Sequence, residues 1–387
     1  MMITLLSACS KVEYESIHTL YFKDSTKSDK ATATFFNSQS GESTEAEMEK
    51  IDEDKNSYTF MCEEDCSVYN MAYVTCGETQ TSEFAFNPCV SGWYKTEDDI
   101  MPFTYGEETD YTAVCDDVTL IGYGYEKRIH IWKPDNYDES SNEKYATVYL
   151  LDGEGALFYD NGEQQLKGNL VASEQINAMT SCTGTKAIIV AIENVYARDY
   201  ELVPEIGESA DEKMFAKYHG EDEKPEYDSM NGTEFADFVA RTLVPYIQEH
   251  YHVYTDALHT AISGPSLGGL EVFYIGLEYP EIFGTVGAMS PSFWEYDAAT
   301  WKEYLNDKSF SNNTTFLYLY TGPAKLDTDP DVTDMYNRLK TMGYPEEKLV
   351  LHFNEKGTHL STFWRNIFSE FLTAMVFQNI KPLQHEN

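Results

Sequence analysis

The stretch GPSLG at residues 264–268 contains a serine between two glycines, and this spacing could support nucleophilic chemistry. A G-x-S-x-G segment between a strand and a helix presents its serine hydroxyl on a tight turn, from which it can attack a carbonyl carbon. The glycines leave room for backbone that passes close to the turn, and Gly269 would let the helix pack tightly against the strand. We therefore predict that Ser266 is a nucleophile. By the geometry of such a turn, the backbone N–H of Leu267 supplies one donor of an oxyanion hole.

A serine hydroxyl needs a neighbouring base to take its proton, so the sequence must also supply a histidine. His359 lies between a strand-like segment and the last helical segment, a position that suits this role. Other histidines are less suitable by position: His250, His252 and His259 precede the serine, His352 lies inside the expected strand, and His385 lies in the tail. We predict that His359 is the base.

An acidic residue between the serine and the histidine would orient the base. The chain order serine, acid, histidine is that of α/β-hydrolases. Asp327, Asp329 and Asp331 all follow the strand-like segment at residues 315–322. Sequence alone does not fix the geometry of this loop, and we select Asp327 as the predicted third member.

Strand-like and helical segments alternate from about residue 115. The strand-like segments are residues 127–134, 145–153, 186–194, 258–264, 283–291, 315–322 and 348–355. Several are continuous apolar runs, typical of a covered, largely parallel sheet. The helical segments are residues 233–251, 266–280 and 361–377, and the first places Phe235, Val239, Leu243 and Ile247 on one face. The pattern predicts the α/β fold class, with the nucleophile between a strand and a helix.

Residues 12–108 have a different pattern, in which short β-like runs alternate with polar connections. The runs are residues 18–22, 32–36, 57–61, 69–76 and 82–86, and the longest polar connection is residues 37–56. Regularly spaced short strands with turn-rich joints predict a small all-β sandwich ahead of the α/β domain.

Six ordered blocks between about residues 145 and 375 resemble one esterase family of the α/β-hydrolases. This family includes enterochelin esterases, feruloyl and acetyl-xylan esterases, S-formylglutathione hydrolase and mycolyltransferases. The blocks are YLLDGEGALF, IIVAIENVYARDYELVP, FVARTLVPYI, AISGPSLGGLEVFYIGLEYPEIFG, MSPSFW and EKGTHLSTFW. The resemblance implies that Ser266 and His359 are catalytic. The family's acid commonly stands three residues after the glycine of the Thr-Gly turn, where this chain has Lys325. Either Asp327 substitutes from a longer loop, or the enzyme works with a serine–histidine pair.

The same resemblance implies further site residues. The second oxyanion donor would be the backbone N–H of Glu154, and Phe293 and Trp294 would line the acyl or alcohol pocket, with core packing as the alternative. Arg198 is a candidate contact for an anionic substrate, and an ion pair with Glu201 is the alternative.

The N-terminal runs are loosely similar to starch-binding carbohydrate-binding modules. The similarity covers about 75 residues and rests on TLYFKD, ATFFN, NMAYVTCGETQTSEFAF and a following GWY. It implies a possible polysaccharide partner for residues 12–108, and a structural spacer is the alternative.

The composition limits the classes of partner. The chain of 387 residues has 66 acidic and 27 basic residues and a formal net charge of −39. Such a surplus opposes binding to nucleic acid or to anionic lipid. An apolar run that ends in Leu-Ser-Ala-Cys9 resembles a bacterial lipobox, so we expect membrane association only through a lipid anchor on Cys9.

The remaining six cysteines are Cys62, Cys66, Cys76, Cys89, Cys115 and Cys182. An even number outside the cell is compatible with disulfides, and a zinc site formed by the first four is the alternative. We expect no metal and no cofactor.

Together these patterns predict three regions: a signal remnant and tether at residues 1–11, a small β-sandwich at 12–108 and an esterase domain at 109–387. The expected activity is that of a serine carboxylesterase acting on a polysaccharide acyl group or a siderophore ester. The alternatives are an acyltransferase of the mycolyltransferase kind and a glycan-binding protein with an inactive hydrolase fold. The expected location is extracellular or on the bacterial cell surface, as a lipoprotein.

Overall fold

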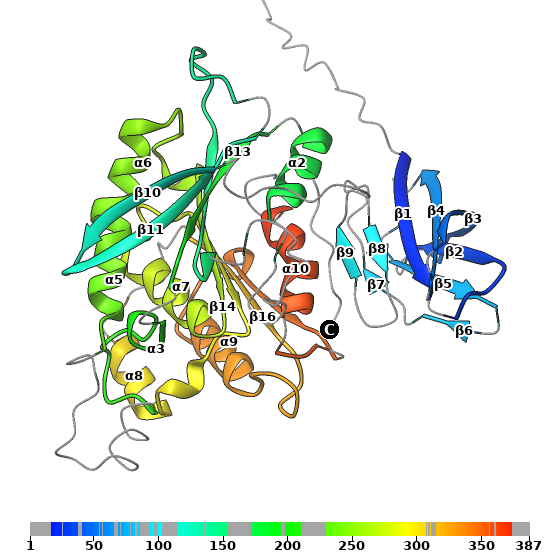
Figure 1. Cartoon of the computed structure of the whole chain (residues 1–387). Coiled ribbons are helices and arrows are strands. Elements are labelled where there is room, and N and C mark those ends of the chain that lie inside the picture. The colour runs from blue at the N-terminus through cyan, green and yellow to red at the C-terminus, as the bar shows by residue number, and fades with distance from the viewer. Residues whose placement is uncertain are drawn as a thin grey trace, which may run out of the picture.

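The computed structural model contains two β-sheets, one formed by the N-terminal strands and one that lies among helices (Figure 1). It describes residues 17–373 with gaps, the longest at 103–114, 157–169 and 211–229. The first sheet contains β1 (Ile17–Asp24), β2 (Ala31–Phe36), β3 (Ser43–Glu53), β4 (Tyr58–Asp65), β5 (Met71–Cys76), β6 (Thr79–Gln80), β7 (Phe84–Ala85), β8 (Trp93–Lys95) and β9 (Ile100–Pro102).

The N-terminal sheet has the order β6-β5-β2-β3-β4-β1-β8-β9, with β7 paired to β5. All described pairs are antiparallel except β1 with β8. One prediction is wrong here, because β3 lies within the polar segment that was expected to be a connection. Ala46 and Met48 are buried while Glu45, Glu47 and Glu49 are exposed. This alternation is the period-2 pattern of a strand with one solvated face.

The long strand β3 joins the two halves of this sheet. Its first half pairs with β2 and its second half with β4, and the register shifts between Lys50 and Asp52. Phe22 of β1, Phe35 of β2 and Val74 of β5 belong to the same buried core. The described strands are therefore all-β and pair into one continuous sheet. This agrees with the predicted all-β class, and the predicted sandwich arrangement stays a prediction.

The second sheet carries the features of an α/β-hydrolase-like fold. Its strands are β10 (Cys115–Gly122), β11 (Tyr125–Trp132), β12 (Ala146–Leu150), β13 (Ala187–Ile192), β14 (Thr260–Pro265), β15 (Thr285–Met289), β16 (Phe316–Thr321) and β17 (Leu349–Phe353). Their order is β10-β11-β13-β12-β14-β15-β16-β17, and every pair from β13 to β17 is parallel. All seven predicted strands are present. Strand β10 was not predicted. It forms a hairpin with β11 through Tyr123 and Gly124, which both have positive φ.

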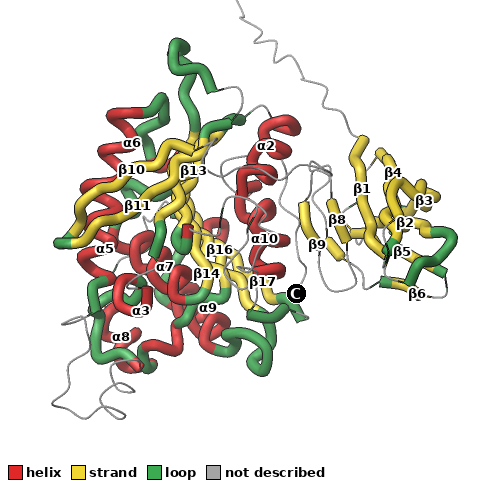
Figure 2. Tube along the Cα trace, in the orientation of Figure 1, coloured by secondary structure: helices red, strands yellow, loops and turns green. Residues whose placement is uncertain are grey.

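Helices cover both faces of this sheet (Figure 2). They are α2 (Ala172–Thr183), α3 (Arg198–Glu201), α5 (Gly232–Phe238), α6 (Val244–His250), α7 (Leu267–Glu278), α8 (Ala298–Asn306), α9 (Asp331–Thr341) and α10 (Ser361–Thr373). Successive residues of β12 point to opposite sides, since Val148 packs in the core under α2 and α10 whereas Tyr149 packs in the core under α5 to α9. The sheet is thus the middle of three layers.

The predicted helix at residues 233–251 is present, but it contains a π-helical turn, η2 (Val239–Leu243), between α5 and α6. Pro245 lies in the first turn of α6 and has no N–H to donate to the preceding turn, which accounts for the wider turn before it. The four apolar residues of the predicted face are all fully buried.

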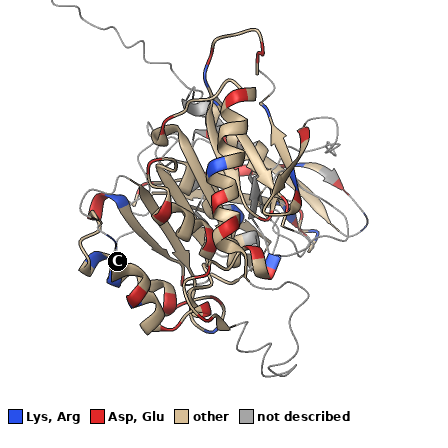
Figure 3. Cartoon of the chain, turned by 90° about the vertical axis from the view of Figure 1, so that its left-hand side faces the viewer, with Lys and Arg blue, Asp and Glu red and all other residues tan. Residues whose placement is uncertain are grey.

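The described cysteine side chains do not form the expected disulfides. Cys62, Cys76 and Cys115 are unpaired thiols, and burial raises the pKa of Cys62 to about 12. Cys66, Cys89 and the side chain of Cys182 lie outside what the structure describes. In the view of Figure 3, acidic residues occur on several helices and loops. No helix within the described part of the chain is long and apolar enough to cross a membrane.

Candidate active site

Ser266 occupies the sharp turn between β14 and α7. Its backbone has φ 59° and ψ −120°, a conformation that non-glycine residues rarely adopt. A side chain at position 264 would come within 2.7 Å of the backbone oxygen of Gly268, and one at Gly269 would come within 3.0 Å of the Met289 oxygen. Close backbone approach therefore requires glycine at positions 264 and 269. The atoms nearest to Gly268 are instead side-chain atoms of Asp152, Pro265 and Leu151, so the prediction of close backbone is wrong at that position.

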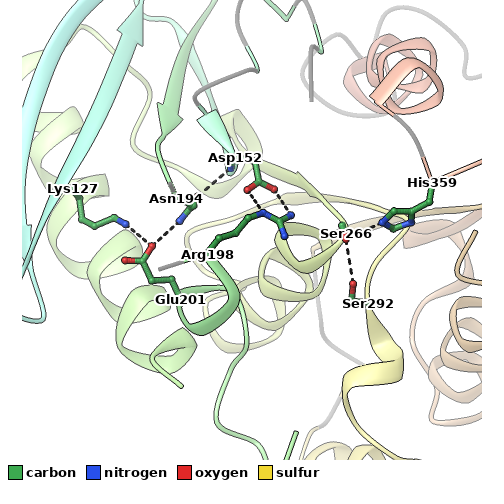
Figure 4. Close-up of polar contacts among 8 residues, drawn as sticks. All are labelled: Lys127, Asp152, Asn194, Arg198, Glu201, Ser266, Ser292 and His359. Carbon is green, nitrogen blue, oxygen red and sulfur yellow. Dashed lines mark hydrogen bonds and ion pairs between the residues drawn. The ribbon is translucent and has the colours of Figure 1, made fainter. Parts of the chain in front are cut away.

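The structure brings the three predicted catalytic side chains into one hydrogen-bonded row. His359 Nε2 lies 2.9 Å from Ser266 Oγ, and His359 Nδ1 lies 3.0 Å from Asp327 Oδ1. A neutral imidazole protonated at Nδ1 donates to the carboxylate and leaves Nε2 free to accept the serine proton. Figure 4 shows Ser266 between His359 and a second serine, Ser292, whose Oγ is 3.5 Å away.

The Asp327 carboxylate is fully buried, and three groups donate to it. Besides His359, Oδ2 accepts the Gly322 backbone N–H and the Ser290 hydroxyl, both at 2.8 Å. The backbone N–H of Asp327 donates to the Pro323 oxygen, so the two extra residues of this loop are taken up in a turn. Lys325, at the position where the family commonly has its acid, is exposed. The longer loop therefore still places an aspartate, Asp327, within hydrogen-bond distance of His359.

Two residues that sequence reasoning missed support this geometry. The Trp364 indole N–H donates to Ser290 Oγ at 2.8 Å, and its ring lies edge-on to the His359 ring with a centroid distance of 5.1 Å. Ser290 lies in MSPSFW and Trp364 in EKGTHLSTFW, so both belong to blocks that carried the family resemblance. Their position directly after β15 and at the start of α10 is the signal that could have identified them.

The predicted oxyanion donors are only partly described. Leu267 is the first residue of α7, so its backbone N–H has no acceptor within the helix and is available to a ligand. Glu154 lies outside the described residues, as does Cys9.

Of the predicted substrate contacts, Phe293 takes the alternative role of core packing, whereas substrate roles for Trp294 and Arg198 stay predictions. Phe293 is 2% exposed and packs edge-on against Phe273 and Trp301, so its side chain belongs to the core. Trp294 is 46% exposed and lies two residues after Ser292. The Arg198 guanidinium makes two contacts to the carboxylate of Asp152, and an ion pair with Glu201 is not found among the described residues. Among the described residues, no cluster of three or more potential metal ligands is found.

The family model described as "Putative esterase" matches residues 123–340, which is more than half of the chain. The chain belongs to this esterase family. The matched range includes Ser266 and Asp327 and ends before His359. The predicted family resemblance is therefore confirmed, whereas the likeness of the N-terminal region to carbohydrate-binding modules stays a prediction.

The chain is also similar in sequence or in fold to individual known proteins. YbbA of Bacillus subtilis, described as uncharacterized, is 24% identical over 160 residues, which are 39% of this chain and 63% of YbbA. The chain thus spans less than two thirds of the length of this relative. The enterobactin esterase FES from Shigella flexneri is similar in fold, with a TM-score of 0.50 and 14% identity over 93% of each chain. The BES protein from Bacillus cereus has a TM-score of 0.49 and 21% identity over 71% of this chain and 98% of its own.

Proposed function

We propose that this protein is a serine carboxylesterase. The observation that carries the proposal is the row Ser266–His359–Asp327, with hydrogen-bond distances of 2.9 and 3.0 Å, at a strained strand–helix turn. A serine, a base and an orienting acid in this arrangement are the parts needed for acyl transfer.

In the proposed reaction, Ser266 Oγ attacks the ester carbonyl carbon while its proton moves to His359 Nε2. The carbonyl oxygen becomes an anion, which the backbone N–H of Leu267 stabilises. The C–O bond to the alcohol then breaks, and the alcohol leaves with the proton from His359. A water molecule then gives a proton to His359 Nε2 and attacks the acyl carbon. The bond to Ser266 Oγ breaks, Oγ takes back the proton, and the carboxylic acid is released. Asp327 accepts a hydrogen bond from Nδ1 throughout and stabilises the imidazolium.

The test compares the wild type with Ser266→Ala on a short activated ester, together with labelling by a fluorophosphonate. We expect the wild type to hydrolyse the ester and to be labelled at Ser266. The variant should lose on the order of 10⁶ in rate and all labelling while it remains folded. Ser140→Ala, at an exposed serine between β11 and β12, is the matched control and should behave as wild type. Absence of labelling in the wild type would instead favour a binding protein with an inactive hydrolase fold.

For the substrate, we propose an ester of a polysaccharide acyl group or of a siderophore. A screen with feruloyl and acetyl polysaccharides and with catecholate esters separates these classes. Retention of the full chain on insoluble xylan or starch tests whether the N-terminal sheet binds glycan. Transfer of the acyl group to an added sugar hydroxyl, in preference to water, would show that the protein is an acyltransferase.

A further inference from the structure

A second pair of charged residues, Asp152 and Arg198, lies close to the nucleophile. Asp152 follows β12 and has φ 54°, a left-handed conformation that the surroundings must impose. Its backbone N–H donates to Asn194 Oδ1 at 3.1 Å. Its carboxylate receives Nε and Nη2 of Arg198 at 2.6 and 2.8 Å (Figure 4). Both the backbone and the side chain of this turn are therefore held.

Asn194 and Arg198, the two residues that hold the Asp152 turn, are connected to a buried polar network. Asn194 Nδ2 donates to Glu201 at 3.1 Å, and Glu201 also accepts from Lys127 Nζ at 2.5 Å. The side chains of Lys127 and Glu201 are 6% and 3% exposed. Arg198 and Glu201 are three residues apart on the single turn of α3, a spacing that places them on one side of a helix. This short helix connects the Asp152 turn to β11.

The Asp152 turn lies against the beginning of α7. The Leu151 backbone N–H donates to the Ser263 oxygen at 3.0 Å, just before the nucleophile. A side chain added at Gly268 would lie 3.1 Å from Asp152 Oδ2, so this carboxylate lies beside the first turn of the helix. The positive potential of that turn stabilises an oxyanion that develops at Ser266. An unpaired carboxylate there would cancel part of this potential.

We propose that Arg198 is a positioning residue for the esterase reaction. It holds the Asp152 turn against the nucleophile and neutralises the Asp152 carboxylate, so that the potential at the start of α7 acts on the oxyanion. The inference rests on the proposed function. It replaces the sequence-based prediction that Arg198 contacts an anionic substrate.

The experiment measures kcat and KM on a neutral ester and on an anionic ester. Arg198→Gln should lower kcat about 100-fold on both esters, with KM changed less than about twofold, because the loss falls on the transition state. The rate of labelling by a neutral fluorophosphonate should fall in parallel. Adding Asp152→Asn to this variant removes the uncompensated charge and should restore at least about tenfold in kcat. Arg198→Lys keeps the charge but loses the two-point contact, so its kcat should lie between those of the wild type and Arg198→Gln.

Arg241→Gln is the matched control, since Arg241 also pairs with a carboxylate, Asp237, at 2.9 Å but on an exposed helix surface. It should leave kcat unchanged. Thermal unfolding establishes that each variant is folded. If Arg198→Gln does not fold, Arg198→Lys and the uncharged pair Arg198→Gln/Asp152→Asn carry the test.

A rise in KM confined to the anionic ester would overturn the proposal in favour of substrate contact. A double variant no faster than Arg198→Gln would overturn the charge compensation. An inactive wild type would refute the proposed function, whereas an active wild type with equally active Arg198 variants would refute this inference alone.

Discussion

Glu271 lies within α7, the helix that begins after the nucleophile, and its carboxyl group should make the stability of the protein depend on pH. The side chain is fully buried, and neither carboxyl oxygen has a hydrogen-bond partner among the described residues. Burial, reinforced by the negative charge of Glu201, raises the pKa of Glu271 well above its usual 4.5. The folded protein therefore keeps a proton that the unfolded chain releases.

The sign and size of the effect follow from this difference. Above pH 4.5 the unfolded state loses the Glu271 proton while the folded state retains it, so raising the pH favours unfolding. This continues until the pH reaches the raised pKa of the folded state. Within that window the contribution is about 1.4 kcal/mol of unfolding free energy per pH unit. Glu271→Gln replaces the carboxyl with an uncharged group of similar shape and removes this dependence.

Urea denaturation of the wild type and Glu271→Gln at several values between about pH 5 and pH 8 measures the effect. The stability of Glu271→Gln relative to the wild type should increase with pH. A constant difference caused by the buried amide does not affect this slope. Glu303→Gln makes the same chemical change at an exposed position on α8 and should track the wild type. Parallel stability curves for the wild type and Glu271→Gln would refute the reasoning.

Two further predictions concern the nucleophile and its acid. Asp327→Asn keeps the shape of the acid but removes its charge, and kcat on an activated ester should fall by about 10⁴. Asp329→Asn and Asp331→Asn should be nearly as active as the wild type, and equal tolerance of all three changes would favour a serine–histidine pair. Gly264→Ala places a methyl group 2.7 Å from a backbone oxygen, and it should lower the unfolding free energy by about 1–3 kcal/mol and abolish fluorophosphonate labelling. An active variant of wild-type stability would show that the turn relaxes freely.

The parts of this molecule that local pattern encodes could be predicted from the sequence. The G-x-S-x-G turn, the seven strands and the buried face of residues 233–251 all follow from backbone sterics and hydrophobic periodicity. The segment that forms β3 was predicted to be a connection, because its many acidic residues obscure the alternation of Ala46 and Met48 with charged residues.

Other features depend on tertiary contacts and could not be predicted. Phe293 and Trp294 are adjacent, and only the fold decides which ring enters the core. Arg198 lies three residues from one acid but pairs with Asp152, which is 46 residues away in the chain. The sequence offers Asp327 as one of three candidate acids. Only the folded turn, in which the Asp327 N–H donates to the Pro323 oxygen, determines where its carboxylate points.

The hydrogen bonds that hold Asp327 come from segments far apart in the chain, so activity should require that the last of these segments has folded. Its carboxylate is held by the Ser290 hydroxyl after β15, and this hydroxyl is held in turn by Trp364 of α10. A partly folded chain could contain the Ser266 turn and most of the sheet, and yet lack an oriented base while α10 is undocked. The appearance of esterase activity during refolding should therefore coincide with the docking of the last described helix rather than with formation of the sheet.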